Sequence, residues 1–156
     1  MPLKRRPQLQ GLSEDHHNAL VVALRCRRVA EGRIDSSPDD VWPGVLEFFA
    51  LQIGPHFEIE ERLLMPALTV LGESAMVERL TEEHERLRAF AAMSRITSAE
   101  LGAFGALLEE HIRYEERQVF EQTQDRLAKE TLDAIARASA QAARICPTTL
   151  RPLTPR

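Results

Sequence analysis

Four of the five histidines in the sequence belong to two kinds of motif, and each motif also contains carboxylates. Two of these histidines end a run of leucine, hydroxyl residue, glutamate, acid and histidine. The other two are followed by glutamate at the fourth and fifth positions and by arginine at the sixth. The two runs are Leu12–His16 and Leu80–His84, and the two longer motifs are His56–Arg62 and His111–Arg117. Because each kind of motif occurs once in each half of the chain, the sequence predicts two similar helical hairpins.

The spacing within these motifs favours a metal site. Residues four apart on a helix differ by about 40° in direction and by about one turn in height. Glu60 therefore faces the same way as His56, and Glu115 the same way as His111. Imidazole and carboxylate groups ligate iron, zinc and manganese, whereas buried carboxylates without a cation must pair or become neutral. One metal ion could use four of the groups and two ions could use all six. The candidate ligands are His16, His56, Glu60, His84, His111 and Glu115.

The elements that must position these side chains are predicted to be helices. Alanine, leucine, glutamate and arginine dominate the composition, and all four favour helix. Valine, isoleucine and threonine never alternate over the length of a strand, which excludes a β-sandwich or barrel. We expect helices over about 13–31, 38–71, 73–95 and 98–127, and an alanine-rich amphipathic segment over 131–145.

Local signals set the expected ends of these helices. Ser13 is a candidate N-cap of the first helix, and Ser37 followed by Pro38 is typical of the start of the second. Gly32 and Gly72 are stop signals. Pro55, after a glycine, should kink the second helix next to His56.

Long helices with short connections predict an all-α fold, an up-down-up-down antiparallel four-helix bundle with an extra C-terminal helical segment. The prolines and basic residues near the chain ends indicate tails. The expected division is a flexible N-terminal tail at 1–10, the bundle at 11–128, a C-terminal helix at 129–146 and a flexible tail at 147–156.

Composition also excludes several classes of function. A formal net charge of −4 and 5 % aromatic residues argue against a nucleic-acid partner. No apolar stretch reaches the roughly 20 residues that span a membrane, and no phosphate-binding loop, nucleotide fingerprint or nucleophile elbow is present. Cys26 and Cys146 are interpreted as free thiols in a reducing cytoplasm.

Over roughly residues 10–127 the sequence resembles the hemerythrin-like family, the HHE cation-binding domain. The resemblance rests on Asp15-His16, His56 with Glu60, Glu83-His84, and His111 with Glu115. It implies an antiparallel four-helix bundle around two iron ions that share an oxo or hydroxo bridge. Carried over to this chain, Glu60 and Glu115 would be the bridging carboxylates and the four histidines the terminal ligands. Zinc or manganese could replace iron in a recombinant preparation.

The chain departs from the oxygen-carrying members at three points. Those members have a second histidine one turn from the one on the third helix, where this chain has Leu80 and Arg88. They also place the last carboxylate five residues after its histidine, which makes Glu116 an alternative to Glu115. His17 is an alternative to His16. The matched repeat favours Glu115 and His16.

The expected function is binding of O2, peroxide or NO. A site that lacks one histidine is more open, which favours peroxide turnover or sensing over O2 transport and leaves catalase-like activity as a candidate. The alternatives are a sensing or iron-storage bundle, read by a protein partner or a second copy through the C-terminal helix, and a helical scaffold without metal. Asp15 and Glu83 could orient ligand rings. Residues three positions after each histidine are expected to line the ligand pocket: Ala19, Ile59, Leu87 and Tyr114.

Overall fold

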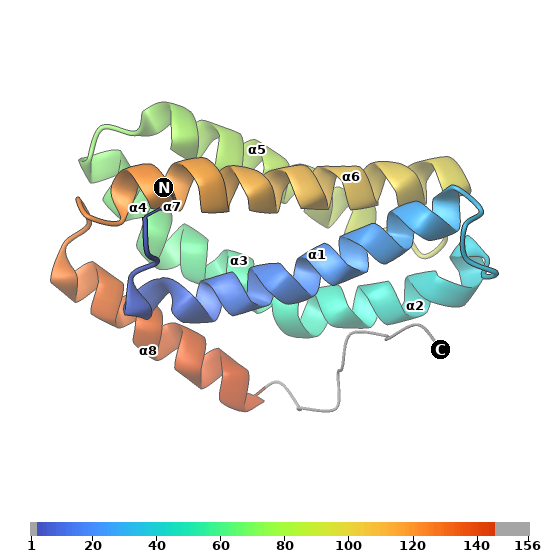
Figure 1. The fold of residues 1–156 in the computed structure, drawn as a ribbon, viewed down its shortest axis with the longest axis horizontal. Coiled ribbons are helices and arrows are strands. Elements are labelled where there is room, and N and C mark those ends of the chain that lie inside the picture. Colours follow the sequence, from blue (N-terminus) through green and yellow to red (C-terminus); the bar gives the residue numbers. More distant parts are fainter. Residues whose placement is uncertain (1–2, 146–156) are drawn as a thin grey trace.

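The computed structural model describes residues 3–145, and their regular structure is entirely helical (Figure 1). The predicted tail at 147–156 and Cys146 lie outside the described residues. Residues 10–30 contact residues 98–114, and residues 74–91 contact both residues 98–114 and residues 65–70. The elements are η1 (Pro7–Leu9), α1 (Gln10–Ala30), α2 (Pro38–Phe48), η2 (Phe49–Ile53), α3 (Gly54–Ile59), η3 (Glu60–Leu64), α4 (Met65–Val70), α5 (Ser74–Ala91), α6 (Ser98–Tyr114), η4 (Glu115–Val119), α7 (Phe120–Thr123) and α8 (Lys129–Ile145).

The helix-end signals of the sequence are largely confirmed. The Ser37 hydroxyl accepts a hydrogen bond from the Asp40 backbone N–H at 3.2 Å, and the Asp40 carboxylate accepts one from the Ser37 N–H at 2.9 Å. This capping box starts α2 at Pro38. Gly32 and Gly72 adopt positive φ angles of 70° and 82° after α1 and α4, a conformation that glycine adopts without strain.

The predicted N-cap of the first helix is wrong. Helix α1 begins at Gln10, three residues before Ser13, because the 3-10 turn η1 leads directly into it. Leu9 in that turn is fully buried, so the chain is already fixed at this point. Ser13 instead donates a hydrogen bond from its hydroxyl to the Glu116 carboxylate at 2.7 Å. The prediction of a tail at residues 1–10 did not anticipate that Leu9 is buried.

Residues 38–70 form one helical rod that contains two π-helical turns, η2 and η3. Turn η2 directly precedes Gly54 and Pro55, where a kink was expected. Proline has no N–H to donate, and the chain adapts by forming a wider turn in which the Gly54 N–H bonds to the Phe49 carbonyl. Turns η3 and η4 begin at Glu60 and Glu115, so both candidate bridging residues open a π turn. Such turns are frequent at functional sites.

The apolar core consists of two clusters separated by a layer of buried polar side chains. On α1, Leu12 belongs to one cluster and Ala19 to the other, with His16 between them. On α5, Leu80 and Leu87 flank His84 in the same way. The polar layer therefore interrupts the core in the middle of the helices, and its groups must be satisfied there.

Close packing of α1 on α6 brings the two halves of the chain together. A Cβ atom at Gly105 of α6 would lie 2.7 Å from the Ala23 carbonyl of α1. Only glycine permits this approach of the two backbones. Helix α8 adds Leu132 and Ile135 to one of the two core clusters and contacts η1, η3 and α3. None of the described helices is long and apolar enough to cross a membrane.

The buried thiol of Cys26 is expected to be unreactive in the folded protein. Burial raises the pKa of this thiol to about 12, so the reactive thiolate is scarce at pH 8. A thiol reagent at pH 8 should modify Cys26 only after denaturant unfolds the chain. Cys26→Ala should remove this denaturant-dependent thiol, and rapid modification of Cys26 in the native protein would contradict the expectation.

Candidate metal centre

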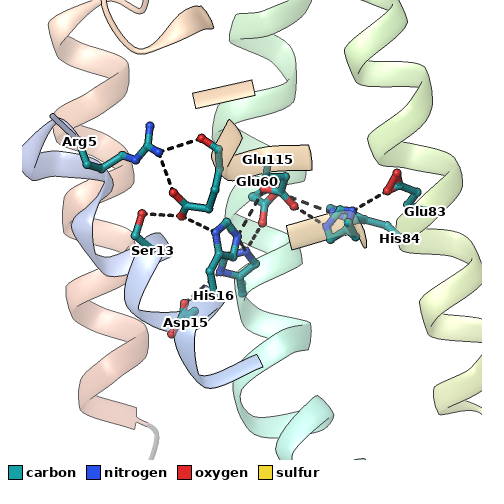
Figure 2. Close-up of polar contacts among 11 residues, drawn as sticks. Arg5, Ser13, Asp15, His16, Glu60, Glu83, His84 and Glu115 are labelled. Carbon is teal, nitrogen blue, oxygen red and sulfur yellow. Dashed lines mark hydrogen bonds and ion pairs between the residues drawn. The ribbon is translucent and has the colours of Figure 1, made fainter. Parts of the chain in front are cut away.

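The structure brings the six predicted ligands together in the buried polar layer. Figure 2 labels His16, Glu60, His84 and Glu115 among them. Their ligand atoms form two groups, and within each group all atoms lie within 4.8 Å of one another. Glu60 and Glu115 belong to both groups. The groups are completed by two histidines each, His16 with His56 and His84 with His111. Every one of the six side chains is buried.

Each histidine presents its two nitrogens to different surroundings. Each Nδ1 atom faces a carboxylate that lies outside the cluster. The distances are 2.7 Å from His16 to Glu116, 3.0 Å from His56 to Asp15, 3.0 Å from His84 to Glu61 and 3.1 Å from His111 to Glu83. Because a carboxylate accepts hydrogen bonds, each Nδ1 donates its hydrogen and Nε2 keeps a lone pair for a metal ion.

The Nε2 atoms point into the cluster. His16 Nε2 lies 3.6 Å from Glu115 Oε2, and His84 Nε2 lies 3.8 Å from Glu60 Oε2. The Nε2 atoms of His16 and His56 lie only 3.1 Å apart. His56 also contacts Glu60, and His111 contacts Glu115, each one turn along its helix.

Several buried atoms of the cluster make no hydrogen bond of ordinary geometry among the described residues, and their ion-pair contacts are with other ligand atoms of the cluster. They are both carboxylate oxygens of Glu60 and of Glu115, and the Nε2 atoms of His84 and His111. Buried polar atoms that make no hydrogen bond cost free energy. A cation would satisfy them, since neutral imidazole nitrogens and carboxylate oxygens are ligands for iron, zinc and manganese. The residues present therefore fit a metal ion in each group, with Glu60 and Glu115 shared.

Ionisation in the metal-free protein reflects the crowding of these charges. Burial lowers the pKa of His111, but the Glu115 and Glu83 carboxylates outweigh this effect and raise it to about 10. Burial and the nearby Glu115 charge raise the pKa of Glu60 to about 7. For His84, burial and the neighbouring His111 lower the pKa to about 4. Protons thus occupy some ligand atoms in the metal-free cluster, and metal binding displaces them.

The four carboxylates outside the cluster link the helical segments that carry the histidines. Asp15 of α1 bonds to His56 of α3, and Glu83 of α5 bonds to His111 of α6. These two acids were expected to orient rings. The other two, Glu61 and Glu116, link the hairpins, and the sequence interpretation missed their role. The available signal was that each directly follows a ligand glutamate at the same place in the repeat.

The structure favours one side of each alternative that the sequence left open. Glu115 points into the cluster, whereas Glu116 holds the outer nitrogen of His16. His17 is exposed, while His16 lies in the cluster. The predicted ligands are thus brought together as a set, and neither Glu116 nor His17 belongs to the two groups.

A small hollow adjoins the cluster beside His16, His56 and His111. Its volume is about 10 Å³, on the order of the space that one water molecule needs. Its apolar walls are formed by Ala19, Ile53, Phe57, Leu108 and Ile112.

Only Ala19 among the four expected pocket residues lines this hollow. Ile59 and Leu87 are buried in the two core clusters, and Tyr114 packs under Arg79, whose Cζ lies 3.7 Å from the ring centroid. A residue three positions after a histidine is rotated by about 60° around the helix axis, which is enough to turn it to a neighbouring helix.

Residues 9–123 match the family model of the hemerythrin HHE cation-binding domain. This match covers most of the chain, and the cluster of histidines and glutamates lies inside it. The chain therefore belongs to the hemerythrin HHE cation-binding family, as the sequence motifs indicated. No curated protein and no solved structure shows significant similarity to it.

Substitution of the two adjacent histidines should separate a ligand from a surface residue. His16→Ala should roughly halve the metal content of the purified protein, because it removes a nitrogen from one of the two groups. His17→Ala should leave metal content unchanged and alter stability by less than about 0.5 kcal/mol, as for an ordinary surface site. Metal analysis of both variants tests this, and a loss caused only by His17→Ala would reverse the assignment.

Proposed function

We propose that this protein is a non-heme di-iron protein that binds O2, peroxide or NO, and that it turns over or senses peroxide rather than transporting O2. The observation that supports the proposal best is the overlap of the two four-residue groups through Glu60 and Glu115. Two shared carboxylates are suited to hold two cations side by side. We also propose that the four long helical segments, residues 10–30, 38–70, 74–91 and 98–123, form the up-down-up-down four-helix bundle of the family.

The chain's own residues would hold two ions with matching ligand sets. Each ion would receive two imidazole nitrogens and oxygens from both shared carboxylates. Iron bound there would supply redox chemistry and a positive charge that attracts small anionic or reducible ligands. The outer acids would keep each ring in place, since they fix the tautomer and the ring orientation.

The ligand set leaves room for a small molecule. At the positions one turn from His84, Leu80 is fully buried in the apolar core and Arg88 pairs with Glu61. Neither side chain can serve as the additional metal ligand that a histidine provides at one of these positions in the oxygen-carrying members. The adjacent hollow has a volume on the order of one water molecule, and its walls are apolar. Such a hollow suits O2, NO or peroxide and excludes larger substrates.

Peroxide decay tests the proposed activity. The iron-loaded protein should consume added hydrogen peroxide faster than the zinc-loaded protein, because zinc has no redox chemistry. Exposure of the ferrous protein to O2 should lead to oxidation within the experiment. Stable, reversible O2 binding with slow autoxidation would contradict the proposal, and equal peroxide decay in both samples would rule out peroxide turnover.

A sensing or storage role read by a partner is the second candidate. Helix α8 contacts η3, the turn that begins at Glu60, and also η1 and α3. A change in metal occupancy at Glu60 could therefore alter the packing of α8, which a partner protein or a second copy could recognise. Faster hydrogen exchange in α8 after metal removal would favour this role. A cytoplasmic location is proposed for either function, in keeping with the free thiol of Cys26.

A further inference from the structure

The rings of His16 and His84 are supported in the same way, although the residues that support them come from different parts of the chain. Phe57 stacks on His84 with ring centroids 3.8 Å apart and an interplanar angle of 12°. Phe120 stacks on His16 with centroids 5.6 Å apart and an angle of 16°. These two histidines are equivalent in the internal repeat, but the two phenylalanines are not.

An arginine lies over the ring of each of these two phenylalanines. The Cζ atom of Arg88 lies 5.5 Å from the Phe57 ring centroid, and that of Arg5 lies 5.1 Å from the Phe120 centroid. Each guanidinium group can attract the face of the ring that it covers. Each of the two phenylalanines thus contacts both a histidine ring of the cluster and a guanidinium group.

The same arginines hold the carboxylates that orient the histidines. Arg88 pairs with Glu61, which accepts the hydrogen bond from His84 Nδ1 at 3.0 Å. Arg5 donates from Nη2 to the Glu116 carboxylate at 2.7 Å and to the Glu116 carbonyl at 2.9 Å. The other oxygen of that carboxylate accepts from His16 Nδ1 at 2.7 Å.

The two arginines have different origins. Arg88 follows His84 by one helical turn on α5. The equivalent position after His16 is Leu20, which has no charge and packs against the apolar core. Helix α1 therefore lacks this arginine, and Arg5 occupies the equivalent place from the segment that precedes η1.

That N-terminal segment is fixed by its own contacts, which suits a positioning role. The buried Gln124 side chain accepts from the Arg6 N–H at 3.0 Å and donates to the Lys4 carbonyl at 3.2 Å. The Leu3 N–H donates to the Glu121 carboxylate at 3.0 Å. These bonds hold the backbone on both sides of Arg5, so its side chain is aimed at Glu116.

We propose that Arg5 and Arg88 are equivalent positioning residues, one for each metal position. Arg5 stabilises the orientation of His16 through Glu116 and Phe120, and Arg88 does the same for His84 through Glu61 and Phe57. This inference rests on the proposed metal centre. It makes the N-terminal segment part of one metal position, so that docking of the segment and metal binding at His16 stabilise each other.

Zinc titration of Arg5→Gln and Arg6→Gln tests the proposal. Both variants remove one positive charge from the same segment, but Arg6 pairs with the exposed Asp125 and does not contact Glu116. Competition with a chromophoric chelator should show roughly tenfold weaker binding of one zinc ion by Arg5→Gln, at the lower end of the effect of outer partners of metal-bound histidines. Arg6→Gln should bind zinc like the original protein, and Arg5→Lys should fall between the two.

A second set of variants assigns the effect to one position. In a His16→Ala background, Arg5→Gln should cause no further loss of zinc affinity, whereas Arg88→Gln should still weaken the remaining site. In a His84→Ala background the result should be reversed. Thermal unfolding of each metal-free variant identifies any substitution that acts only through the fold.

The outcomes distinguish this inference from the proposed function. If the unsubstituted protein binds no zinc, the metal centre itself is refuted. If it binds two zinc ions and Arg5→Gln binds both with unchanged affinity, the positioning role of Arg5 is refuted. An equal loss in Arg6→Gln, or a loss in Arg5→Gln that persists undiminished in the His16→Ala background, also overturns the proposal.

Discussion

Glu60→Gln is expected to abolish binding of two metal ions while leaving the metal-free protein folded. Glu60 is completely buried and belongs to both ligand groups. Glutamine offers one neutral oxygen in place of a charged, bridging carboxylate. Loss of a group that only hydrogen-bonds to a metal ligand weakens metal binding about 10- to 100-fold. Removal of a ligand that both ions share should therefore weaken metal binding by more than about 100-fold. Elemental analysis of the purified variant measures the effect.

The same substitution should not destabilise the metal-free protein. Burial and the Glu115 charge raise the pKa of Glu60 to about 7, which shows that the buried carboxylate is unfavourable in the absence of a cation. Replacing it by a neutral isostere should leave the free energy of unfolding unchanged or higher. The matched control is Glu58→Gln on the same helix, because Glu58 is exposed. Normal metal content in Glu60→Gln, or a loss in Glu58→Gln, would contradict the assignment.

Removal of metal from the unsubstituted protein should lower its unfolding temperature by on the order of 10 °C. A ligand at 1,000 times its Kd stabilises the folded state by about 4 kcal/mol, and a chain of this size gains about 2–4 °C per kcal/mol. The ligands come from α1, α3, η3, α5, α6 and η4. Loss of the cations would leave buried ligand atoms without a hydrogen bond in the polar layer between the two core clusters.

Thermal unfolding before and after chelation measures this difference, and zinc added back to the chelated protein should restore it. His16→Ala should reduce the shift between loaded and metal-free protein, and His17→Ala should not. If chelation leaves the unfolding temperature unchanged, the polar layer does not depend on a metal ion and a helical scaffold without metal becomes the better account.

The side chains of the candidate metal centre could be predicted because their spacing within each helix is a local feature of the sequence. His56 with Glu60 and His111 with Glu115 lie one turn apart, and helical geometry alone makes each pair face the same way. The internal repeat then indicates that equivalent residues of the two hairpins share one environment. The structure brings all of these side chains into the same buried layer.

The roles of Glu61, Glu116 and Arg5 depend on contacts between distant segments. Glu116 lies on η4 and bonds to His16, which is separated from it by 100 positions in the sequence. No local pattern states that a basic residue near the N-terminus reaches this carboxylate. The start of α1 was missed for a related reason, because burial of Leu9 fixes the chain before Ser13.

The residues that line the hollow could not be predicted because the position of a residue on a helix only limits the direction in which its side chain points. Tyr114 follows His111 by three residues, yet its ring lies under Arg79 of α5. Ile53 and Leu108, which line the hollow, each precede a histidine by three residues. Which of the two sides of a helix faces the cavity is decided by the packing of neighbouring helices.

Metal content and absorption spectra of the iron-reconstituted protein test whether the chain holds a di-iron centre. We predict two iron ions per chain with the charge-transfer bands of an oxo-bridged pair, and loss of both features in Glu60→Gln. A protein that binds no iron under these conditions, or retains the same iron content and spectrum after Glu60→Gln, would contradict this prediction.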